Sequence, residues 1–264
     1  MSLDLVVAAG VVAVGAAVRS TWSPCGLSML SSITPLTERA KGHRFGVTAS
    51  WFIAGAVVGG TLLGALAALL AAGWHGLHLD RDLVRAVAAI AAVAAGAVDL
   101  GLFPWQPPFF HRQVDDAWLR QYRPWVYGAG FGLQIGAGLA TYIMTSAVVL
   151  TLVLAAMSGS PWVALGIGAG FGLVRGLAVL LGARATTPAA LQSLHARFDA
   201  WEAPVRVGVG RLLLAVSVGL IMANSWRSAV GWGCFVLVVD RQATRRRQHR
   251  TRKVAEARSV AVGT

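Results

Sequence analysis

Long apolar runs alternate with short polar segments along most of this 264-residue chain. A helix needs about 20 consecutive apolar residues to cross the hydrocarbon core of a membrane. The pattern therefore predicts an all-α polytopic membrane protein with six core transmembrane helices, at 3–36, 46–72, 83–102, 126–157, 161–181 and 205–223.

A proline-rich, charged segment at 104–124 divides these spans into two sets of three. Because each set crosses the membrane an odd number of times, any duplication would be inverted. We therefore expect two inverted three-helix halves, 1–103 and 125–224, joined by a cytoplasmic loop at 104–124. The string Ala-Gly-Phe-Gly-Leu occurs at both 129–133 and 169–173, and its small residues indicate close helix contact.

Basic residues follow the first, third and fifth spans and fill the C-terminal tail. The positive-inside rule places such segments in the cytoplasm, so we expect the N-terminus outside. Six spans would leave the basic tail, 241–264, outside as well. A short seventh span at 225–240 would return the tail to the cytoplasm. The alternative is an interfacial or re-entrant segment, because this apolar stretch is short for a crossing.

Composition supports the membrane class, since 56% of the residues are hydrophobic and 13% are charged, against about 25% charged in soluble domains. The formal net charge of +12 resides mainly in loops and tail, which indicates topology and contact with membrane lipid rather than nucleic acid. Two cysteines without metal-ligand spacing predict no disulfide scaffold, metal or cofactor. The start of the chain lacks the basic region of a cleaved signal, so the first span should remain in a cytoplasmic membrane.

The segment 21–30 reads Thr-Trp-Ser-Pro-Cys-Gly-Leu-Ser-Met-Leu, with a second proline at Pro35. Proline breaks a membrane helix, which is tolerated only where protein or a water-filled cavity satisfies the exposed backbone groups. Pro24 therefore predicts a break at which Cys25 is reachable. The alternative is a kinked helix in which Cys25 packs as a small apolar residue.

This segment resembles the CcdA/DsbD family of membrane thiol-reductant conductors, whose first span carries a Ser-Pro-Cys motif. Ser23-Pro24-Cys25 matches that motif, and Gly130-Phe131-Gly132 looks like the start of the family's second motif. The resemblance implies a six-span core, Cys25 as the reactive residue, and thioredoxin-like partners on both sides of the membrane.

The family's second Pro-Cys, in the fourth span, is replaced here by Ala137-Gly138. Cys25 therefore lacks the partner with which the family forms its disulfide, and Cys234 is the other cysteine in the chain. A single thiol can form a mixed disulfide with a partner protein, and a nearby cation such as Arg19 would stabilise its thiolate. The alternative is a divergent branch that serves the maturation of periplasmic enzymes, such as the MauF type in methylamine utilisation.

Three charged residues, Arg19, Asp99 and Arg175, lie at about one depth when each odd span is counted inward. A charge at a helix centre costs about 2.5–3.5 kcal/mol, so we expect the three to face one another. Asp99 would neutralise one arginine and leave positive charge for a substrate anion, a thiolate or a carbonyl cluster. Gln134 and Thr141 would add hydrogen bonds. The alternative is a structural Arg–Asp pair, with the other arginine reaching the inner headgroups.

These features predict three alternative functions. The first is support of thiol-redox transfer or maturation of extracytoplasmic proteins, with chemistry at Cys25, Pro24, Arg19 and Cys234. The second is secondary transport of a small anion or amino-acid-like solute, bound by Arg19, Asp99, Arg175 and Gln134. The third is a structural or assembly subunit without chemistry. Dependence on cysteine distinguishes the first function from the second.

Overall fold

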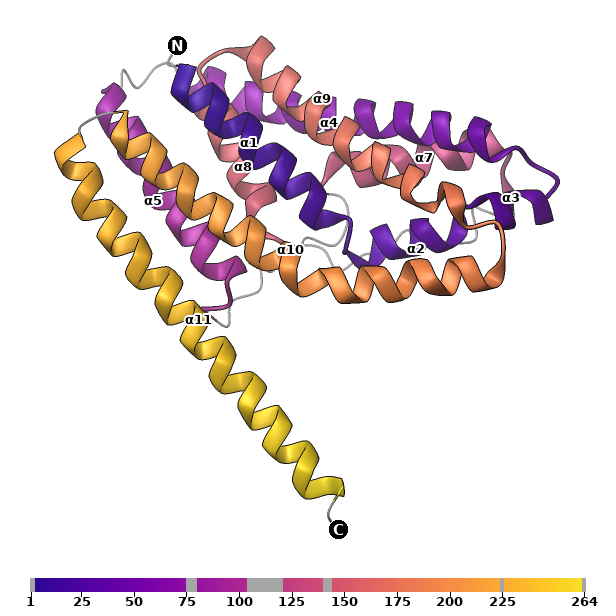
Figure 1. Ribbon diagram of the computed structural model, residues 1–264. Coiled ribbons are helices and arrows are strands. Elements are labelled where there is room, and N and C mark those ends of the chain that lie inside the picture. The colour runs from indigo at the N-terminus through magenta and orange to yellow at the C-terminus, as the bar shows by residue number, and fades with distance from the viewer. Residues whose placement is uncertain (1–2, 75–79, 104–120, 140–143, 224–225, 263–264) are drawn as a thin grey trace.

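The computed structural model describes residues 3–74, 80–103, 121–139, 144–223 and 226–262. All regular structure in these ranges is helical, as the apolar pattern predicts (Figure 1). The elements are α1 (Leu3–Ser20), α2 (Pro24–Ser32), α3 (Pro35–Ala40), α4 (Phe45–Trp74), α5 (Arg81–Asp99), α7 (Pro124–Ala137), α8 (Ser146–Met157), α9 (Pro161–Leu177), the 3-10 helix η2 (Ala178–Arg184), α10 (Pro188–Met222) and α11 (Trp226–Val262).

Within the described residues, four helical segments are long and apolar enough to cross a membrane. They are Leu3–Ser20, Phe45–Gly73, Pro161–Arg184 and Pro188–Met222. Helix α8 is apolar but has only 12 residues, and α5 carries charged residues near both ends. These segments are those of an integral membrane protein, while the six-span arrangement stays a prediction.

Glycines bring the backbone of α4 into direct contact with α7 and α9. A Cβ atom built on Gly60 would lie 2.2 Å from the carbonyl oxygen of Gly168, and one on Gly132 would lie 2.0 Å from that of Phe52. The successive contacts show that α9 runs antiparallel to α4 and that α7 runs parallel to it. The close contact predicted from the repeated string is therefore present, and α4 is the common partner of both copies.

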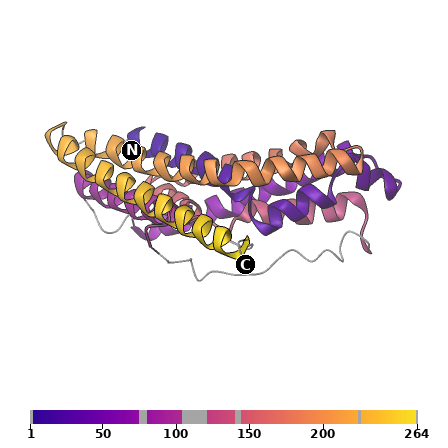
Figure 2. The same cartoon turned by 60° about the horizontal axis from the view of Figure 1, so that its bottom comes forward.

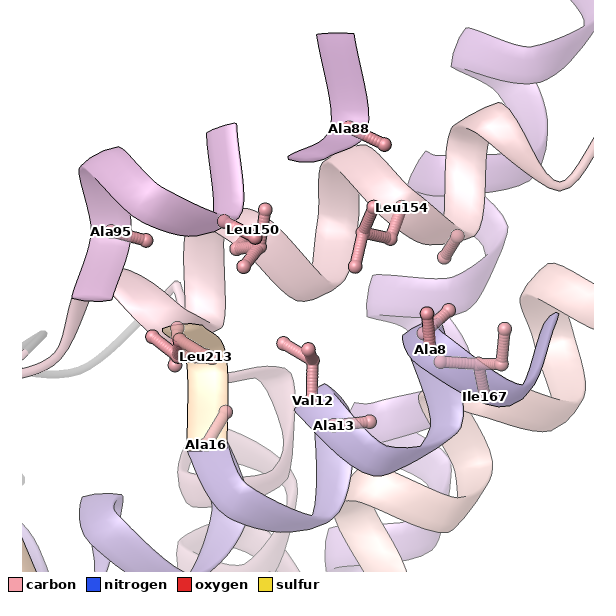
Figure 3. Close-up of a cluster of buried hydrophobic side chains, with 14 of the residues drawn as sticks. Ala8, Val12, Ala13, Ala16, Ala88, Ala95, Leu150, Leu154, Ile167 and Leu213 are labelled. Carbon is pink, nitrogen blue, oxygen red and sulfur yellow. The ribbon is translucent and has the colours of Figure 1, made fainter. Parts of the chain in front are cut away.

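The largest hydrophobic core joins α1 to α4, α5, α8, α9 and α10. Figure 3 shows part of this core, in which Val12 of α1 lies near Leu150 of α8 and Leu213 of α10. Many core members are alanines, which allow helix axes to approach closely. Helix α1 therefore packs against most of the long helices through one face, while Val7, Val11, Val14 and Val18 on its other face are exposed.

The helices form a flat slab with α10 along one face (Figure 2). Helix α10 contains Pro204 and bends near its middle (Figure 1). The segment before the proline, 188–203, is rich in polar residues, and we call it the polar half of α10. It lies alongside α2, whereas the remainder of α10 packs against α5.

The predicted seventh segment and the basic tail are parts of one continuous helix, α11. This differs from the expected division at residue 240, and no helix breaker lies there to cause one. Figure 1 shows α11 beside α10 and α5 at its start and extending beyond the other helices at its end. Helix α11 is not among the segments apolar enough to cross a membrane, so a seventh span stays a prediction.

Polar contacts attach α11 to the bundle. Arg211 of α10 forms an ion pair with Asp240 at 2.9 Å. Farther along, Arg246 Nη1 donates to the carbonyl oxygen of Leu102 at 2.7 Å, and Arg247 donates to that of Leu100 at 3.0 Å. Two tail arginines therefore satisfy carbonyl groups just past the C-terminal end of α5.

Candidate functional site

The first predicted span is broken at residues 21–23, which we call the first break. Ser23 is the N-cap of α2, and its Oγ accepts a hydrogen bond from the backbone N–H of Gly26 at 3.2 Å. Pro24 occupies the first turn, where a missing N–H costs nothing. The Ser-Pro-Cys motif is therefore a helix start, and it places Cys25 in the first turn of α2.

Gly26 is required by the close approach of the chain to itself at the first break. A Cβ atom at this position would lie 2.2 Å from the carbonyl oxygen of Thr21. Any other residue would force the backbone of α2 away from the end of α1. The geometry of the motif thus depends on Gly26 as well as on Pro24.

Cys25 is buried, with 2% of its surface exposed. It belongs to a hydrophobic cluster that also contains Met29, Phe52, Phe131 and Phe198. The break does not open Cys25 to solvent, which corrects the expectation of a reachable thiol. The reason is that side chains of α4, α7 and α10 pack in the same cluster as Cys25.

The position that the resemblance assigns to a second cysteine is shaped for glycine. Gly138 ends α7 with φ at 68°, a left-handed conformation that glycine adopts without strain. A Cβ atom there would also lie 3.0 Å from Cε1 of Phe171. Cys234 is exposed on α11, and the structure contains no disulfide between it and Cys25.

The fourth predicted span, 126–157, is also divided. Helix α7 ends at Ala137 and α8 begins at Ser146, which leaves a second break between them. The structure describes its two edges, and Thr141, a candidate hydrogen-bonding residue, lies outside the described residues. This break was not predicted, although Gly136 and Gly138 followed by Thr145-Ser146 are the signals that indicate it.

Arg175, on α9, joins the two breaks. Its side chain is buried, with 3% of the residue exposed. Nη1 donates to the carbonyl oxygen of Ile135 at 2.6 Å, and Nη2 donates to that of Ser20 at 3.4 Å. These carbonyls lie in the last turns of α7 and α1, where a cation is favoured by the helix dipole. The surplus positive charge was predicted to serve a substrate anion, a thiolate or a carbonyl cluster. The hydrogen bonds of Arg175 are to carbonyl groups.

Asp99 is engaged at the start of α8. Its carboxylate accepts hydrogen bonds from the backbone N–H of Ser146 at 3.0 Å, from Ser146 Oγ at 2.7 Å and from Thr145 Oγ1. Negative charge at a helix N-terminus is favourable. Asp99 thus caps the helix that follows the second break.

Arg19 has different neighbours from those predicted. Its Nη2 lies 3.5 Å from Oε1 of Glu202, and it interacts electrostatically with Asp99 and Arg206. The ion-pair partner of Arg19 is thus Glu202, which was not predicted, and the mutual facing of Arg19, Asp99 and Arg175 stays a prediction. The arginine that interacts electrostatically with Cys25 is Arg175, in place of the expected Arg19.

Gln134 is half-buried on α7. Its neighbour Ile135 supplies a backbone carbonyl to Arg175, but no hydrogen bond joins the Gln134 side chain to the predicted charges within the described residues. The structure therefore does not place Gln134 in a shared polar cavity.

The polar half of α10 covers the first break, a feature that the sequence analysis missed. Trp22 Nε1 donates to the carbonyl oxygen of Phe198 at 2.8 Å, and Ser31 Oγ is hydrogen-bonded to His195 Nε2 at 3.0 Å. A third α10 residue, Glu202, forms an ion pair with Arg19 at 3.5 Å. The three α10 residues are spaced by three and four positions, which puts them on one helix face. Thr187-Pro188 is a typical helix start, and the spacing of these residues after it was the sequence signal for this helix face.

A buried carboxylate on α3, Glu38, was also missed. Glu38 is 0% exposed and accepts hydrogen bonds from Tyr127 OH at 2.6 Å, Thr48 Oγ1 at 2.5 Å and Lys41 Nζ at 3.2 Å. These donors come from α7, α4 and the end of α3. The Glu38 cluster therefore connects the segment after α2 to two long helices.

Comparison with known proteins finds one group of relatives. The chain is 29% identical over 218 residues to the methylamine utilization protein MauF of Paracoccus versutus, which covers 81% of this chain and 77% of that protein. It is 29% identical over 220 residues to MauF of Paracoccus denitrificans (80% and 75%), and 29% identical over 211 residues to MauF of Methylophilus methylotrophus (77% and 70%).

No family model and no solved structure matches the chain. The relatives support the MauF-type alternative of the sequence analysis, and membership of the CcdA/DsbD family is not shown. The chain is thus an integral membrane protein that is similar to MauF proteins over about four-fifths of its length.

Proposed function

We propose that this chain is a MauF-type membrane protein that supports the maturation of an extracytoplasmic enzyme of methylamine utilisation. The observation that carries the proposal is the similarity to MauF proteins, which extends over most of the chain and over more than two thirds of each of these three relatives. The membrane-spanning character of the helices agrees with an accessory role at the membrane.

We also propose that the spans form two inverted halves, the first built on α1/α2, α4 and α5 and the second on α7/α8, α9 and α10. Two observations support this arrangement. The first span of each set is broken, and the parallel course of α4 and α7 is what alternating crossings require. In this topology the N-terminus lies outside and the C-terminal end of α5 lies in the cytoplasm.

The contacts of Arg246 with Leu102 and of Arg247 with Leu100 support a cytoplasmic tail, because they place the tail arginines at the inner end of α5. From Trp226 to Arg246 a helix rises about 30 Å, the thickness of the hydrocarbon core. The first part of α11 would therefore complete a seventh crossing.

Cys25 is the proposed reactive residue, acting as a single thiol. The N-terminal end of α2 and the guanidinium of Arg175 both favour negative charge at its sulfur. A single thiol can carry a mixed disulfide with a thioredoxin-like partner but cannot store two electrons as an internal disulfide. Access would require the polar half of α10 to move away from the first break.

Transport of an anion through the predicted constellation has less support. Arg175 is committed to backbone carbonyls and Asp99 to the start of α8. Neither side chain is left to line a substrate path, so we do not propose the transporter function.

The proposal is tested by deleting the gene from its own organism and growing the strain on methylamine. We expect growth on methylamine to be lost together with the active extracytoplasmic enzyme, while growth on a carbon source unrelated to methylamine is unchanged. Normal growth on methylamine would contradict the proposal.

Complementation of that strain with Cys25→Ser and Cys234→Ser variants tests the thiol role separately. If Cys25 is reactive, Cys25→Ser fails to restore growth although the protein reaches the membrane, and Cys234→Ser restores it. Restoration by both variants would leave the maturation role intact and remove the thiol from it.

A further inference from the structure

Arg19 at the end of α1 and Arg206 in the second part of α10 each have a buried N–H group without a partner among the described residues. Arg19 is 3% exposed, and its Nη1 has no hydrogen-bond acceptor among the described residues. The Nε atom of Arg206 is buried and lacks an acceptor in the same part of the chain. Arg206 follows Glu202 by four residues on α10, and Glu202 lies 3.5 Å from Arg19 Nη2, so the two guanidinium groups are on the same part of the contact between α1 and α10 and repel each other.

Buried donors without acceptors are rare in native proteins, because each loses its hydrogen bonds to water without replacement. The penalty is larger when the donor is charged. Two cations brought together in a buried place add their mutual repulsion. This arrangement is explained if a group that is both an acceptor and an anion binds to the two arginines.

Among the residues that the structure describes, the nearby carboxylates do not fill that role. Asp99 accepts its hydrogen bonds from Thr145 and Ser146 at the start of α8, and Asp240 is paired with Arg211. Glu202 approaches Arg19 Nη2 at 3.5 Å, but its side chain is 49% exposed and it does not reach Nη1. The described acidic groups near Arg19 and Arg206 therefore leave an excess of positive charge.

That excess extends to α11. Burial, with Arg206 and Arg211 nearby, lowers the pKa of Arg247. Arg247 is held in this position by its hydrogen bonds to the carbonyl oxygen of Leu100. The inner ends of α1, α10 and α5 thus share a region in which cations outnumber anions.

We propose that Arg19 Nη1 and Arg206 Nε form a binding site for a phosphate-type oxyanion. A guanidinium matches the oxygens of a phosphate in geometry and charge, and its charge-assisted hydrogen bonds are about twice as strong as neutral ones. The half-exposed Glu202 marks the side from which the anion would enter. This site does not depend on the proposed role in methylamine utilisation.

Two sources share this chemistry. In the proposed topology Arg19 lies about 24 Å along α1 from Leu3, which is near the inner headgroups. The phosphate of an anionic inner-leaflet lipid could therefore reach it, and free inorganic phosphate from the cytoplasm could do the same. The experiment has one arm for each source.

The full-length protein is purified in a neutral detergent and stripped of lipid, and its thermal unfolding is followed by tryptophan fluorescence. Sodium phosphate is compared with sodium chloride at equal ionic strength, and short-chain phosphatidylglycerol is compared with short-chain phosphatidylcholine. At ligand concentrations about 100 times the Kd we expect Tm to rise by about 5–10 °C. The Arg19→Gln and Arg206→Gln variants should each bind at least about tenfold more weakly.

Arg184→Gln is the matched control, because Arg184 is exposed at the end of η2 and should not alter the response. A rise in Tm with phosphate assigns the site to a free oxyanion, and a rise with phosphatidylglycerol alone assigns it to lipid. The proposal is overturned if neither ligand raises Tm, or if Arg19→Gln and Arg206→Gln respond as Arg184→Gln does.

A second measurement does not depend on the variants folding. Native mass spectrometry of the unmodified protein, released gently from its detergent, reports bound phosphate or phospholipid directly. We expect one phosphate-bearing ligand per chain, removed by competing phosphate or phosphatidylglycerol. Protein that carries no such ligand, and takes none up when it is added, would overturn the proposal.

Discussion

Arg175 Nη1 lies 2.6 Å from the carbonyl oxygen of Ile135, so α9 is bonded directly to the last turn of α7. The same guanidinium reaches the carbonyl oxygen of Ser20 in the last turn of α1. The last carbonyls of a helix have no intrahelical donor, and inside a membrane they have no water either. One buried cation therefore supplies donors to two helices that stop within their predicted spans.

Replacing Arg175 with glutamine should destabilise the protein by about 2–4 kcal/mol, because a shorter neutral side chain leaves both carbonyls without their charged donor. The measurement is thermal unfolding in detergent, with Arg184→Gln as the exposed control. Equal Tm values for the two variants would show that Arg175 does not connect the breaks.

Gly26→Ala should disrupt the first break, since its Cβ atom would lie 2.2 Å from the carbonyl oxygen of Thr21. The expected cost is about 1–3 kcal/mol or more, as for other overpacked sites. Gly10→Ala is the control, because a Cβ atom on Gly10 meets nothing within 4 Å. Size-exclusion chromatography of the extracted proteins, followed by heating curves, should separate the two. If Gly26→Ala elutes and unfolds as Gly10→Ala does, the close approach of Gly26 to the carbonyl group of Thr21 is not present.

Gly60→Ala should prevent α4 and α9 from crossing at their present distance. The added methyl group would lie 2.2 Å from the carbonyl oxygen of Gly168, and backbone atoms cannot turn aside as a flexible side chain can. We expect strongly reduced yield of folded protein from membranes. Gly170→Ala, also on this helix pair but with open space around its Cβ, should give normal yield. Similar yields of Gly60→Ala and Gly170→Ala would show that α4 and α9 do not cross at Gly60.

Glu38 and Tyr127 should be energetically coupled, since Tyr127 OH donates to the buried carboxylate at 2.6 Å. In a double-mutant cycle built from Glu38→Gln and Tyr127→Phe, we expect a coupling free energy of about 1–3 kcal/mol. Chemical unfolding of the four proteins in detergent measures it. Strictly additive effects would indicate that the two groups do not share a hydrogen bond.

The break after Ser20 illustrates what is predictable from local sequence. Pro24 cannot donate a backbone hydrogen bond, and its ring restricts the conformation of the residue before it. The helix is therefore interrupted here regardless of how the rest of the chain folds. Ser23 then completes the start of α2 as its N-cap. The close contacts of the glycines in the repeated string are also predictable from local sequence, because small side chains permit close helix contact with any suitable partner.

The second break was harder to predict because no proline marks it. Gly138 is compatible with many conformations, and its left-handed φ is known only from the structure. The polar half of α10 resembles a cytoplasmic loop in composition, and its role appears only when Phe198 and His195 are seen against Trp22 and Ser31.

The sequence by itself determined that this chain is helical, apolar enough to span a membrane, broken before Pro24 and rich in close helix contacts. These properties depend on side-chain hydrophobicity, on proline geometry and on glycine size, which act locally. Only the tertiary structure decided the partners of the charges: Arg175 bonds to Ile135, Asp99 to Ser146, and Arg19 pairs with Glu202. Residue counting gives the depth of a charge along its helix, but its partner depends on how each helix is rotated and on which backbone groups the breaks expose.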